Sequence, residues 1–384
     1  MALACAVTRP LARACMLGAN EDPMAQTRGL SLPLISRTAA PNDSVILPDS
    51  WYAIAPAAAI RADRPLALER LGQHWVAWRD ARGDVALLPA PCPHRGADLS
   101  LGRVRAGEIE CPYHGFRFTG AGACTAMPCE GPDAKIPARM RAEVPIVREA
   151  HGLIWLWQGE AREDLPGLPW IEGSPVPTRR NAKIEDVWPV SFTRIMEGMQ
   201  DIHHLPFAHR KIDPFERMRL DPTHTEIEHG QDGVARIHSV ATIRHEHEAP
   251  EKGYTFRIDT AFPGLIRLGF DDSKLVGTIV LCPVDAERTW LWACYQIETR
   301  LGGVIDRLVS ELSLWFEFRF VQPDDLRMTS TSRPQACTIA DHVLVRADGP
   351  IAAWHKLRRQ RLGQHAHEHD PIAAESDDKL RAQA

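Results

Sequence analysis

The chain has 384 residues, of which 44% are hydrophobic and 25% are charged, a composition typical of an ordinary soluble protein with room for two domains. A formal net charge of -5 and the lack of a long basic run argue against nucleic acid as a partner, because phosphate binding needs clustered Lys and Arg. No stretch approaches the roughly 18 consecutive apolar residues that span a bilayer, and nine widely spread cysteines do not resemble a secreted disulfide framework, so we expect a cytoplasmic protein without a membrane span.

The first half of the chain predicts a leader, one domain and a linker. Residues 1–44 show no clean apolar core followed by a cleavage site, and we expect a disordered leader there; a transit peptide and a later start at Met24 stay open as alternatives. Short β-type runs such as "HWVAWRD", "DVALLPA" and "GLIWLWQG" are separated by Gly, Pro and Asp, which predicts an all-β domain over 45–162. The proline-rich segment 163–180 predicts a linker.

Residues 181–362 change to longer strand-like runs, which predict an antiparallel sheet with helices. The runs cover 224–229, 234–245, 255–270, 275–283 and 288–298. An apolar stripe at helical spacing then predicts an amphipathic helix whose stripe packs into the core against the sheet. The stripe consists of Val304, Ile305, Leu308, Val309, Leu312, Trp315 and Phe316. A further helix is expected over 348–362, where Pro350 suits the first turn, followed by a disordered tail over 363–384.

Two loops rich in Gly and Pro each place a cysteine beside a histidine. The four residues are Cys92, His94, Cys111 and His114, in the order C-x-H-x16-C-x2-H. Each spacing is too short to close a helical turn, so the two side chains of a loop must converge from one tight bend, and Gly96 supplies backbone freedom just past the first. Thiolates are soft ligands and imidazoles borderline ones, so the set suits zinc or an iron-sulfur cluster.

The order of these ligands, followed by Gly115 and Phe116, resembles the Rieske [2Fe-2S] motif, in which one iron takes two thiolates and the other two imidazoles. Rieske proteins of respiratory complexes add a cysteine inside each loop, whereas Ala97 and Tyr113 stand at those positions here. This difference favours the lower-potential Rieske modules of oxygenases and their ferredoxins. A ferredoxin would end soon after "GLIWLWQG", and this chain continues to residue 384.

A second constellation lies in "EGMQDIHHLPFAH", residues 197–209, and contains Asp201-x-x-His204-x4-His209. Five residues on a straight helix turn by about 140°, so the two histidines can share one face only if the helix is broken. Pro206 lies between them and can supply that break. Two neutral imidazoles and one carboxylate form a facial triad that holds Fe(II) and leaves positions open.

This constellation resembles the mononuclear iron motif of the Rieske-type non-haem iron oxygenases, the aromatic ring-hydroxylating enzymes, in their terminal oxygenase (alpha) subunit. The resemblance covers roughly residues 45–360 and implies that the third ligand follows the long helix, in "FVQPDDLRMTSTSRP". We expect it to be Asp325, with Asp324 as the fallback. It also implies that Asp201 bridges a Rieske histidine of one subunit and an iron-bound histidine of its neighbour. His203, one step away from the motif position, is expected to point elsewhere.

The resemblance further implies an α+β fold, in which an all-β Rieske domain precedes an antiparallel-sheet catalytic domain with long C-terminal helices in a helix-grip, START-like arrangement. It implies a homotrimer with two cofactors, a Rieske [2Fe-2S] cluster on the four loop ligands and a mononuclear Fe(II) on His204, His209 and Asp325. No glycine-rich dinucleotide fingerprint is present, so NAD(P)H would act through a separate partner, a flavin or iron-sulfur reductase or a ferredoxin.

The implied activity is O2-dependent hydroxylation, demethylation or dihydroxylation of a small, cyclic organic substrate, with monooxygenation favoured because the chain resembles enzymes built from alpha subunits alone. Two other classes stay open. An electron-transfer protein with a non-catalytic ligand-binding domain would hold the cluster but no third iron. A zinc-stabilised binding module would be colourless.

Overall fold

The structure is a computed structural model, and it describes residues 45–178, 181–210, 218–221, 223–245, 253–270, 275–299 and 301–368, with side chains as far as residue 363. The expected leader at 1–44, the end of the expected linker at 179–180 and the expected tail beyond residue 368 lie outside the described residues. None of the helices in the described ranges is long and apolar enough to cross a bilayer.

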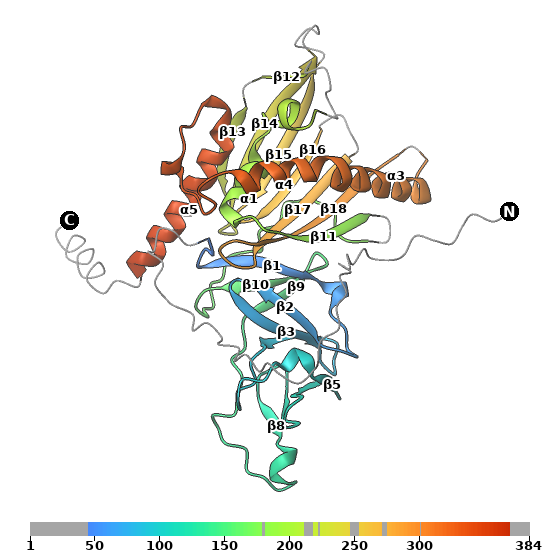
Figure 1. Cartoon of the computed structure of the whole chain (residues 1–384), viewed down its shortest axis with the longest axis vertical. Coiled ribbons are helices and arrows are strands. Elements are labelled where there is room, and N and C mark those ends of the chain that lie inside the picture. The colour runs from blue at the N-terminus through green and yellow to red at the C-terminus, as the bar shows by residue number, and fades with distance from the viewer. Residues whose placement is uncertain are drawn as a thin grey trace, which may run out of the picture. The chain divides into compact units, whose positions relative to one another are not determined.

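The first domain is built from small antiparallel sheets, as the sequence predicts (Figure 1). The strands are β1 (Ser50–Pro56), β2 (Leu66–Arg70), β3 (Gln73–Arg79), β4 (Val85–Pro89), β5 (Arg103–Arg105), β6 (Glu108–Glu110), β7 (Arg117–Phe118), β8 (Cys124–Ala126), β9 (Val147–Ala150) and β10 (Leu153–Gln158). They form the sheets β1-β10-β9, β2-β3-β4 and β5-β6-β7-β8. Pairing of β1 with β10 joins the two ends of the domain.

One large antiparallel sheet dominates the second domain. Its strands are β11 (Ala182–Trp188), β12 (Met218–Leu220), β13 (His224–His229), β14 (Ala235–His245), β15 (Tyr254–Ala261), β16 (Leu265–Phe270), β17 (Leu275–Pro283) and β18 (Thr289–Ile297). The order is β11-β18-β17-β16-β15-β14-β12, and β13 also pairs with β14. In β14, Ile237, Ser239, Ala241 and Ile243 are buried while the residues between them are partly exposed, the period-two pattern of a strand with one covered face.

The run 255–270, predicted as one strand, is instead the hairpin of β15 and β16. The reason lies in the tip, because Pro263 has no N–H to offer a strand ladder. Gly264 beside it packs so closely that a Cβ would lie 2.6 Å from the carbonyl oxygen of Leu281.

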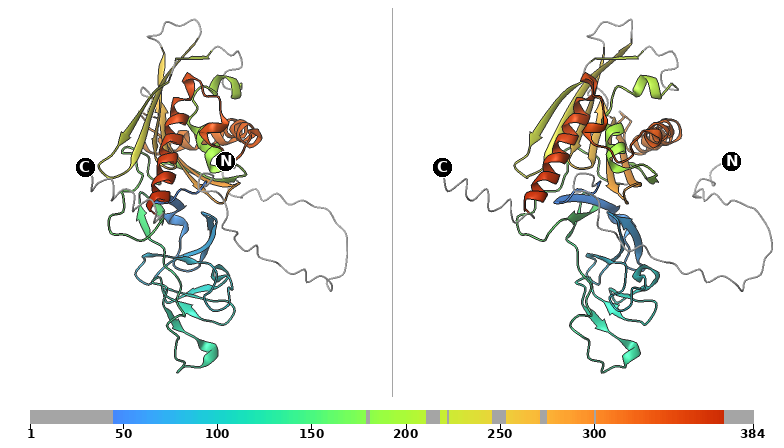
Figure 2. Two further views of the ribbon diagram at one scale, coloured as in Figure 1. Left: turned by 90° about the vertical axis from the view of Figure 1, so that its left-hand side faces the viewer. Right: turned by 60° about the vertical axis from the view of Figure 1, so that its left-hand side comes forward.

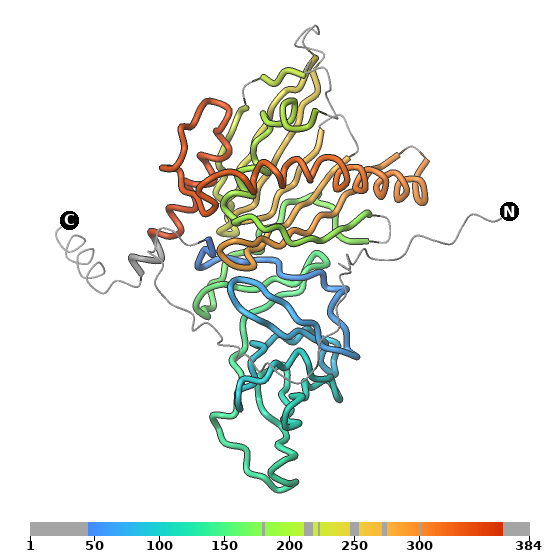
Figure 3. Tube along the Cα trace, viewed as in Figure 1, coloured from blue at the N-terminus to red at the C-terminus, as the bar shows by residue number. Residues whose placement is uncertain are grey.

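Helices cover one face of this sheet, the arrangement expected from the sequence (Figures 1 and 2). They are α1 (Phe192–Gln200), α2 (Leu205–Ala208), α3 (Gly303–Phe316), a π-helical turn (Glu317–Val321), α4 (Gln322–Thr331) and α5 (Gly349–Glu368). The trace in Figure 3 shows α3 and α4 joined through the π-helical turn without a loop. Helix α5 is fixed to the sheet by Trp354, which is fully buried and donates from Nε1 to Pro263 O at 3.0 Å.

The prediction that the apolar stripe of α3 belongs to the core was wrong. Val304 is 84% exposed and Leu308 is 63% exposed, whereas the helix contacts the sheet through the buried residues Ser310 and Leu314. Ser310 Oγ accepts from Ile297 N at 2.9 Å. Periodicity shows which residues share a helix face, but it does not show what covers that face.

The packed residues form two separate apolar cores. The larger one combines β1 and β10 with the sheet and helices of the second domain. The backbone also joins the two domains, since Leu71 N donates to Pro283 O at 2.8 Å and Gly72 N donates to Val284 O at 2.7 Å. The smaller core, which contains Cys92 and Cys111, lies entirely within the first domain. The two predicted metal centres therefore belong to different cores.

A buried carboxylate ties α1 to α5 and to the segment before it. Glu197 Oε1 accepts from His355 Nε2 at 2.6 Å, from His342 Nε2 at 2.8 Å and from Cys337 Sγ at 3.1 Å, while Oε2 accepts from Arg194 Nη1 at 2.7 Å. Burial acts to raise the pKa of Glu197, but these hydrogen bonds and charges outweigh it and the pKa is lowered. Burial raises the pKa of the Cys337 thiol to about 12, so the thiol keeps its proton and donates.

We therefore predict that Glu197→Ala lowers the free energy of unfolding at neutral pH by about 3–5 kcal/mol, because it leaves the buried Arg194 charge without its partner. The matched control is Glu311→Ala, which removes the exposed ion pair with Arg307 and should cost less than about 1 kcal/mol. Urea unfolding followed by tryptophan fluorescence measures both. Equal, small losses in the two variants would contradict a structural role for the network.

The same network predicts a pH dependence. Because the pKa of Glu197 is lower in the folded protein than in the unfolded chain, its contribution is present above the unfolded pKa and is lost as the pH falls through the folded pKa. The stability difference between wild type and Glu197→Gln should therefore shrink in acid. A difference that grows as the pH falls would show that the sign is wrong.

Candidate metal centres and substrate cavity

The two Cys-His loops of the first domain share one backbone pattern. In the first, Cys92 N donates to Ala97 O and Gly96 N donates to Cys92 O, both at 2.8 Å. The second loop repeats both bonds around Cys111, at 2.8 and 3.1 Å. Gly96 and its counterpart Gly115 each have a φ of 72°, a left-handed conformation that favours glycine. Two equivalent bends thus present two equivalent pairs of side chains.

The four side chains of these loops face one another. Cys92 and Cys111 are each 3% exposed, and the rings of His94 and His114 have their centroids 4.7 Å apart. Burial raises the pKa of the Cys92 thiol to about 11, and the neighbouring Cys111 thiol adds to the rise. His114 Nδ1 is buried and has no hydrogen-bond partner among the described residues. Thiols with a raised pKa ionise when a metal cation binds them, and an imidazole nitrogen without a hydrogen-bond partner is available to a metal. Both features fit a [2Fe-2S] cluster.

The histidine side of this site is the side nearer to the solvent. The His94 ring stacks on Phe116 with centroids 4.6 Å apart, and Tyr113, which is 60% exposed, lies 3.9 Å from the His114 ring. The two cysteines belong to the apolar core beneath. A cluster held by these four residues would therefore have its imidazole ligands on the side nearer to the solvent.

In the second domain, a broken helix places the two predicted iron-binding histidines. Helix α1 ends at Gln200, and α2 is a single turn with His204 at its N-terminal cap and His209 at its C-terminal cap. The two histidines flank the single turn α2, and the departure from helical geometry that their spacing required lies at His209, with φ -100° and ψ 60°, rather than at Pro206. Pro206 sits in the first turn of α2, where a missing N–H costs nothing.

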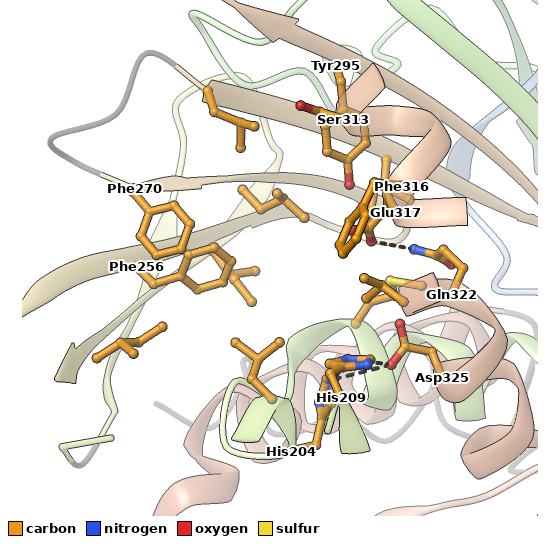
Figure 4. A pocket seen from close by; sticks show the side chains of 18 of the residues that line it. His204, His209, Phe256, Phe270, Tyr295, Ser313, Phe316, Glu317, Gln322 and Asp325 are labelled. Carbon is orange, nitrogen blue, oxygen red and sulfur yellow. Dashed lines mark hydrogen bonds and ion pairs between the residues drawn. The ribbon is translucent and has the colours of Figure 1, made fainter. Parts of the chain in front are cut away.

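Three ligand atoms from α2 and α4 meet at one point (Figure 4). His204 Nε2 lies 3.2 Å from His209 Nε2, and Asp325 Oδ1 lies 3.3 and 3.2 Å from those two nitrogens. Ligand atoms bound about 2.1 Å from a common ion stand roughly 3.0–3.4 Å apart, so the three contacts fit one metal ion. The contacts of 2.6 and 2.8 Å within the Glu197 network are shorter and fit hydrogen bonds instead.

The neighbouring aspartate is placed differently. Asp324 Oδ2 lies 3.9 Å from His209 Nδ1, and its other oxygen lies 3.7 Å from Arg327 Nη2. Asp325 alone of the two reaches both Nε2 atoms. The π-helical turn just before α4 sets this orientation, because it changes the phase of the helix between α3 and α4.

Asp201 lies behind the first histidine. Its Oδ2 is 3.7 Å from His204 Nδ1, and its Oδ1 accepts from His203 N at 2.8 Å. Burial acts to lower the pKa of His204, but the carboxylates of Asp201 and Asp325 raise it to about 10. The same contacts lower the pKa of Asp325 against the effect of its burial. His203 turns away from this group, with its Nδ1 3.4 Å from Thr223 Oγ1.

A cavity of about 770 Å³ opens directly onto these ligands. Most of its lining is apolar and comes from the sheet, α3 and the turn after it (Figure 4). The apolar residues include Ile243, Phe256, Ile258, Leu268, Phe270, Leu275, Ile279, Leu312, Trp315, Phe316 and Val321. The sequence did not indicate three polar lining residues, Tyr295, Glu317 and Gln322, because a π-helical turn leaves no sequence signal that marks which residues it turns inward.

A second cavity of about 310 Å³ reaches the same ligands from the side of α1. It is lined by Asp201, His204 and Asp325 together with Glu197 and His342. The predicted iron site therefore has one apolar approach and one approach bounded by titratable groups.

Comparison with known proteins agrees with this geometry. Residues 50–146 match the family described as the Rieske [2Fe-2S] domain. The chlorophyllide a oxygenase of Chlamydomonas reinhardtii is 35% identical over 161 residues, which cover 41% of this chain and 24% of that protein. The oxygenase subunit of 3-chlorobenzoate-3,4-dioxygenase from Comamonas testosteroni is 34% identical over 145 residues, 38% of this chain and 33% of that subunit. The chain thus spans about a quarter to a third of the length of these relatives.

Among solved structures, dicamba monooxygenase bound to dicamba superposes with a TM-score of 0.65 and 20% identity, covering 84% of this chain and 99% of that one. At this identity the likeness concerns the fold, and it extends through both domains. Residues 50–146 are therefore a Rieske [2Fe-2S] domain, and the chain as a whole has the fold of dicamba monooxygenase.

Proposed function

We propose that this chain is the terminal oxygenase component of a multi-protein system, which uses O2 and electrons from a separate NAD(P)H-dependent reductase to oxidise a small cyclic molecule. The observation that supports this most directly is the pairing, in one chain, of a Rieske domain with three converging ligand atoms at the end of a cavity. A Rieske electron carrier needs no such convergence. The alternative of a non-catalytic ligand-binding domain leaves it unexplained.

In this proposal, the residues of the second domain have three different roles. His204, His209 and Asp325 would hold an Fe(II) ion, which supplies dioxygen activation when bound. The apolar walls of the cavity exclude water and hold a hydrophobic substrate against this end. Asp201 fixes the orientation of the His204 ring from behind, as outer carboxylates do for metal-bound imidazoles.

Electrons would pass between neighbouring subunits rather than within one. Cys92 and Cys111 belong to the smaller core, which includes no residue of the second domain, while the imidazoles of His94 and His114 lie nearer to the surface. Asp201 also lines the second cavity, so it is open to an approach from outside its own domain. A homotrimer in which Asp201 meets a Rieske histidine of the next subunit would join the two centres.

The reaction type we favour is monooxygenation, that is, hydroxylation or oxidative demethylation. Dicamba monooxygenase and Pseudomonas putida NdmA, whose structures contain dicamba, caffeine or theobromine, share the fold. A 4beta-methylsterol monooxygenase of Methylococcus capsulatus is 30% identical over 194 residues. The 3-chlorobenzoate dioxygenase relative supports dihydroxylation as the second candidate.

An isotope experiment tests this proposal. The protein is reduced chemically without air, mixed with 2-methoxynaphthalene and then exposed to 18O2, with products read by mass spectrometry. Monooxygenation predicts one labelled oxygen per product molecule, either in hydroxylated probe or in the formaldehyde that accompanies 2-naphthol. Dihydroxylation predicts two. Reoxidation of the cluster without labelled product from this probe or from a panel of larger cyclic ethers and ketones would favour the electron-transfer alternative.

Metal content tests the choice of third ligand. Asp325→Ala should lose the mononuclear iron while the [2Fe-2S] signal in electron paramagnetic resonance stays unchanged, because the variant removes one of three ligand atoms. Asp324→Ala is the control and should keep both iron centres, since its carboxylate lies farther from the site. Iron lost from Asp324→Ala but retained in Asp325→Ala would reverse the assignment.

The bridging role of Asp201 predicts a purely kinetic effect. Asp201→Asn should keep its cluster and its iron but slow oxidation of the reduced cluster during single turnover by roughly tenfold or more. Asp186→Asn, at an exposed position on β11, is the control. An Asp201→Asn protein that turns over at the wild-type rate would remove this residue from the electron path.

A further inference from the structure

Among the polar side chains that interrupt the apolar lining of the large cavity, which also include Arg244, His245 and Ser313, are three that we call the polar wall. They are Tyr295 from β18, Glu317 from the start of the π-helical turn and Gln322 from the start of α4. Figure 4 shows Glu317 between Tyr295 and the ligands of the metal site, with Phe256 and Phe270 on the opposite side of the pocket. The polar wall is therefore next to the site of chemistry, not at the mouth of the cavity.

Part of the hydrogen-bonding capacity of the polar wall is unused. Gln322 Nε2 donates to Glu317 Oε1 at 3.0 Å, while Gln322 Oε1 is buried without a partner among the residues that the structure describes. Tyr295 is 5% exposed as a residue, and its hydroxyl forms no hydrogen bond within the described ranges. An unmatched buried polar group costs about 1–3 kcal/mol, so such groups facing a cavity point to a ligand that completes them.

The neighbouring strand makes room for this arrangement. Gly277 on β17 lies beside the Tyr295 ring, and a Cβ at that position would come within 3.2 Å of it. The Tyr295 ring therefore lies against the strand at Gly277, and Figure 4 shows its hydroxyl directed toward Glu317. The packing of the sheet thus fixes the orientation of the Tyr295 side chain.

The charged groups nearest the polar wall are three carboxylates and the two histidines of the candidate metal site. Glu317, Asp325 and Asp201 all line the cavity at this end. The only Lys or Arg among the described lining residues is Arg244, near the end of β14, and its Nε is already 3.5 Å from Asp221 Oδ1. Burial raises the pKa of Glu317; the hydrogen bond from Gln322 opposes this rise and Asp325 adds to it. A carboxylate placed against the polar wall would meet the Glu317 carboxylate first and would find no free Lys or Arg in the described lining, whereas the positive charge of this end, on His204 and the metal ion it would hold, lies beyond Glu317.

From this arrangement we propose that the cavity binds a neutral, largely apolar polycyclic molecule whose single hydroxyl or carbonyl group is held by Tyr295 and Glu317, and that it rejects carboxylates at this end. The volume of about 770 Å³ is large enough for a polycyclic skeleton. Tyr295 can donate to the oxygen of either group, and Glu317 can pair with a hydroxyl in either protonation state. This inference rests on the proposed function in taking the cavity as the substrate site.

Three probes of equal skeleton test the inference by binding alone. Pyrene, 1-hydroxypyrene and 1-pyrenecarboxylate are titrated into the iron-loaded protein without dioxygen, so that no turnover occurs. We expect 1-hydroxypyrene to bind about three- to tenfold more tightly than pyrene, the worth of one hydrogen bond, and 1-pyrenecarboxylate at least about tenfold more weakly than pyrene. Equal or tighter binding of the carboxylate would overturn the proposal.

Two conservative variants test which residues cause these differences in affinity. Tyr295→Phe should reduce the affinity for 1-hydroxypyrene to that for pyrene, and Glu317→Gln should strengthen carboxylate binding by about tenfold while pyrene binds unchanged. Tyr254→Phe is the matched control, because Tyr254 lines the same cavity but is 56% exposed. A hydroxyl preference that survives in Tyr295→Phe, or that disappears in Tyr254→Phe, would place the polar contact elsewhere and refute the assignment.

The outcome is separable from that of the oxygenase proposal. If 18O2 labels the product but the carboxylate binds as well as the hydroxyl probe, the polar wall is refuted and the oxygenase stands. If the probes bind in the expected order but no labelled product forms, the recognition site stands and the oxygenase assignment fails.

Discussion

The structure depends on one constraint, the convergence of two imidazole nitrogens and one carboxylate oxygen within 3.2–3.3 Å of one another in a mostly buried place. His204 and His209 can reach that point because they flank the single turn α2, which ends in a non-helical conformation at His209. Asp325 reaches it because the π-helical turn shifts the phase of α4. The Glu197 network then holds α1, which precedes α2, against α5 and residues 337–342. Local irregularities in two helices are thus the features that create the site.

The same π-helical turn also shapes the proposed substrate cavity. It directs Glu317 into the cavity and Asp325 toward the histidines, so one deviation from regular helix places the proposed recognition group next to the proposed metal ligand. The exposed stripe of α3 leads into this region, because Leu312, Trp315 and Phe316 line the cavity although they are open to solvent. In the first domain, by contrast, two regular loops with left-handed glycines are enough to hold four ligands.

Much of the site was readable from the sequence because its signals are short-range. The Cys-His loops and the Asp201, His204 and His209 spacing each lie within about two dozen residues of chain, and the strands of the sheet show as runs of apolar and β-branched residues. The third ligand could be narrowed to two adjacent aspartates, and only the fold separates them. The need for a departure from a straight helix between the two histidines was also predicted, although the structure places it at His209 rather than at Pro206.

What the sequence did not indicate depends on long-range packing. The partners of Glu197 lie 140–158 residues away in the chain, so nothing local marks His342, Cys337 and His355 as a group. The stripe of α3 has the periodicity of a core helix, yet the sheet is contacted by Ser310 and Leu314 instead. The sequence shows Tyr295 only as an aromatic residue of a strand. Its place beside Gly277 and in front of the cavity is visible only in the structure.

The central claim is that one polypeptide carries two separate iron centres, one of them without sulfide. The most direct test is to measure iron and acid-labile sulfide in protein purified without oxygen, with the reduced [2Fe-2S] cluster quantified by electron paramagnetic resonance. The account predicts about three iron atoms and two sulfide ions per chain. About two iron atoms per chain beside a fully occupied cluster, even after incubation with Fe(II), would contradict it.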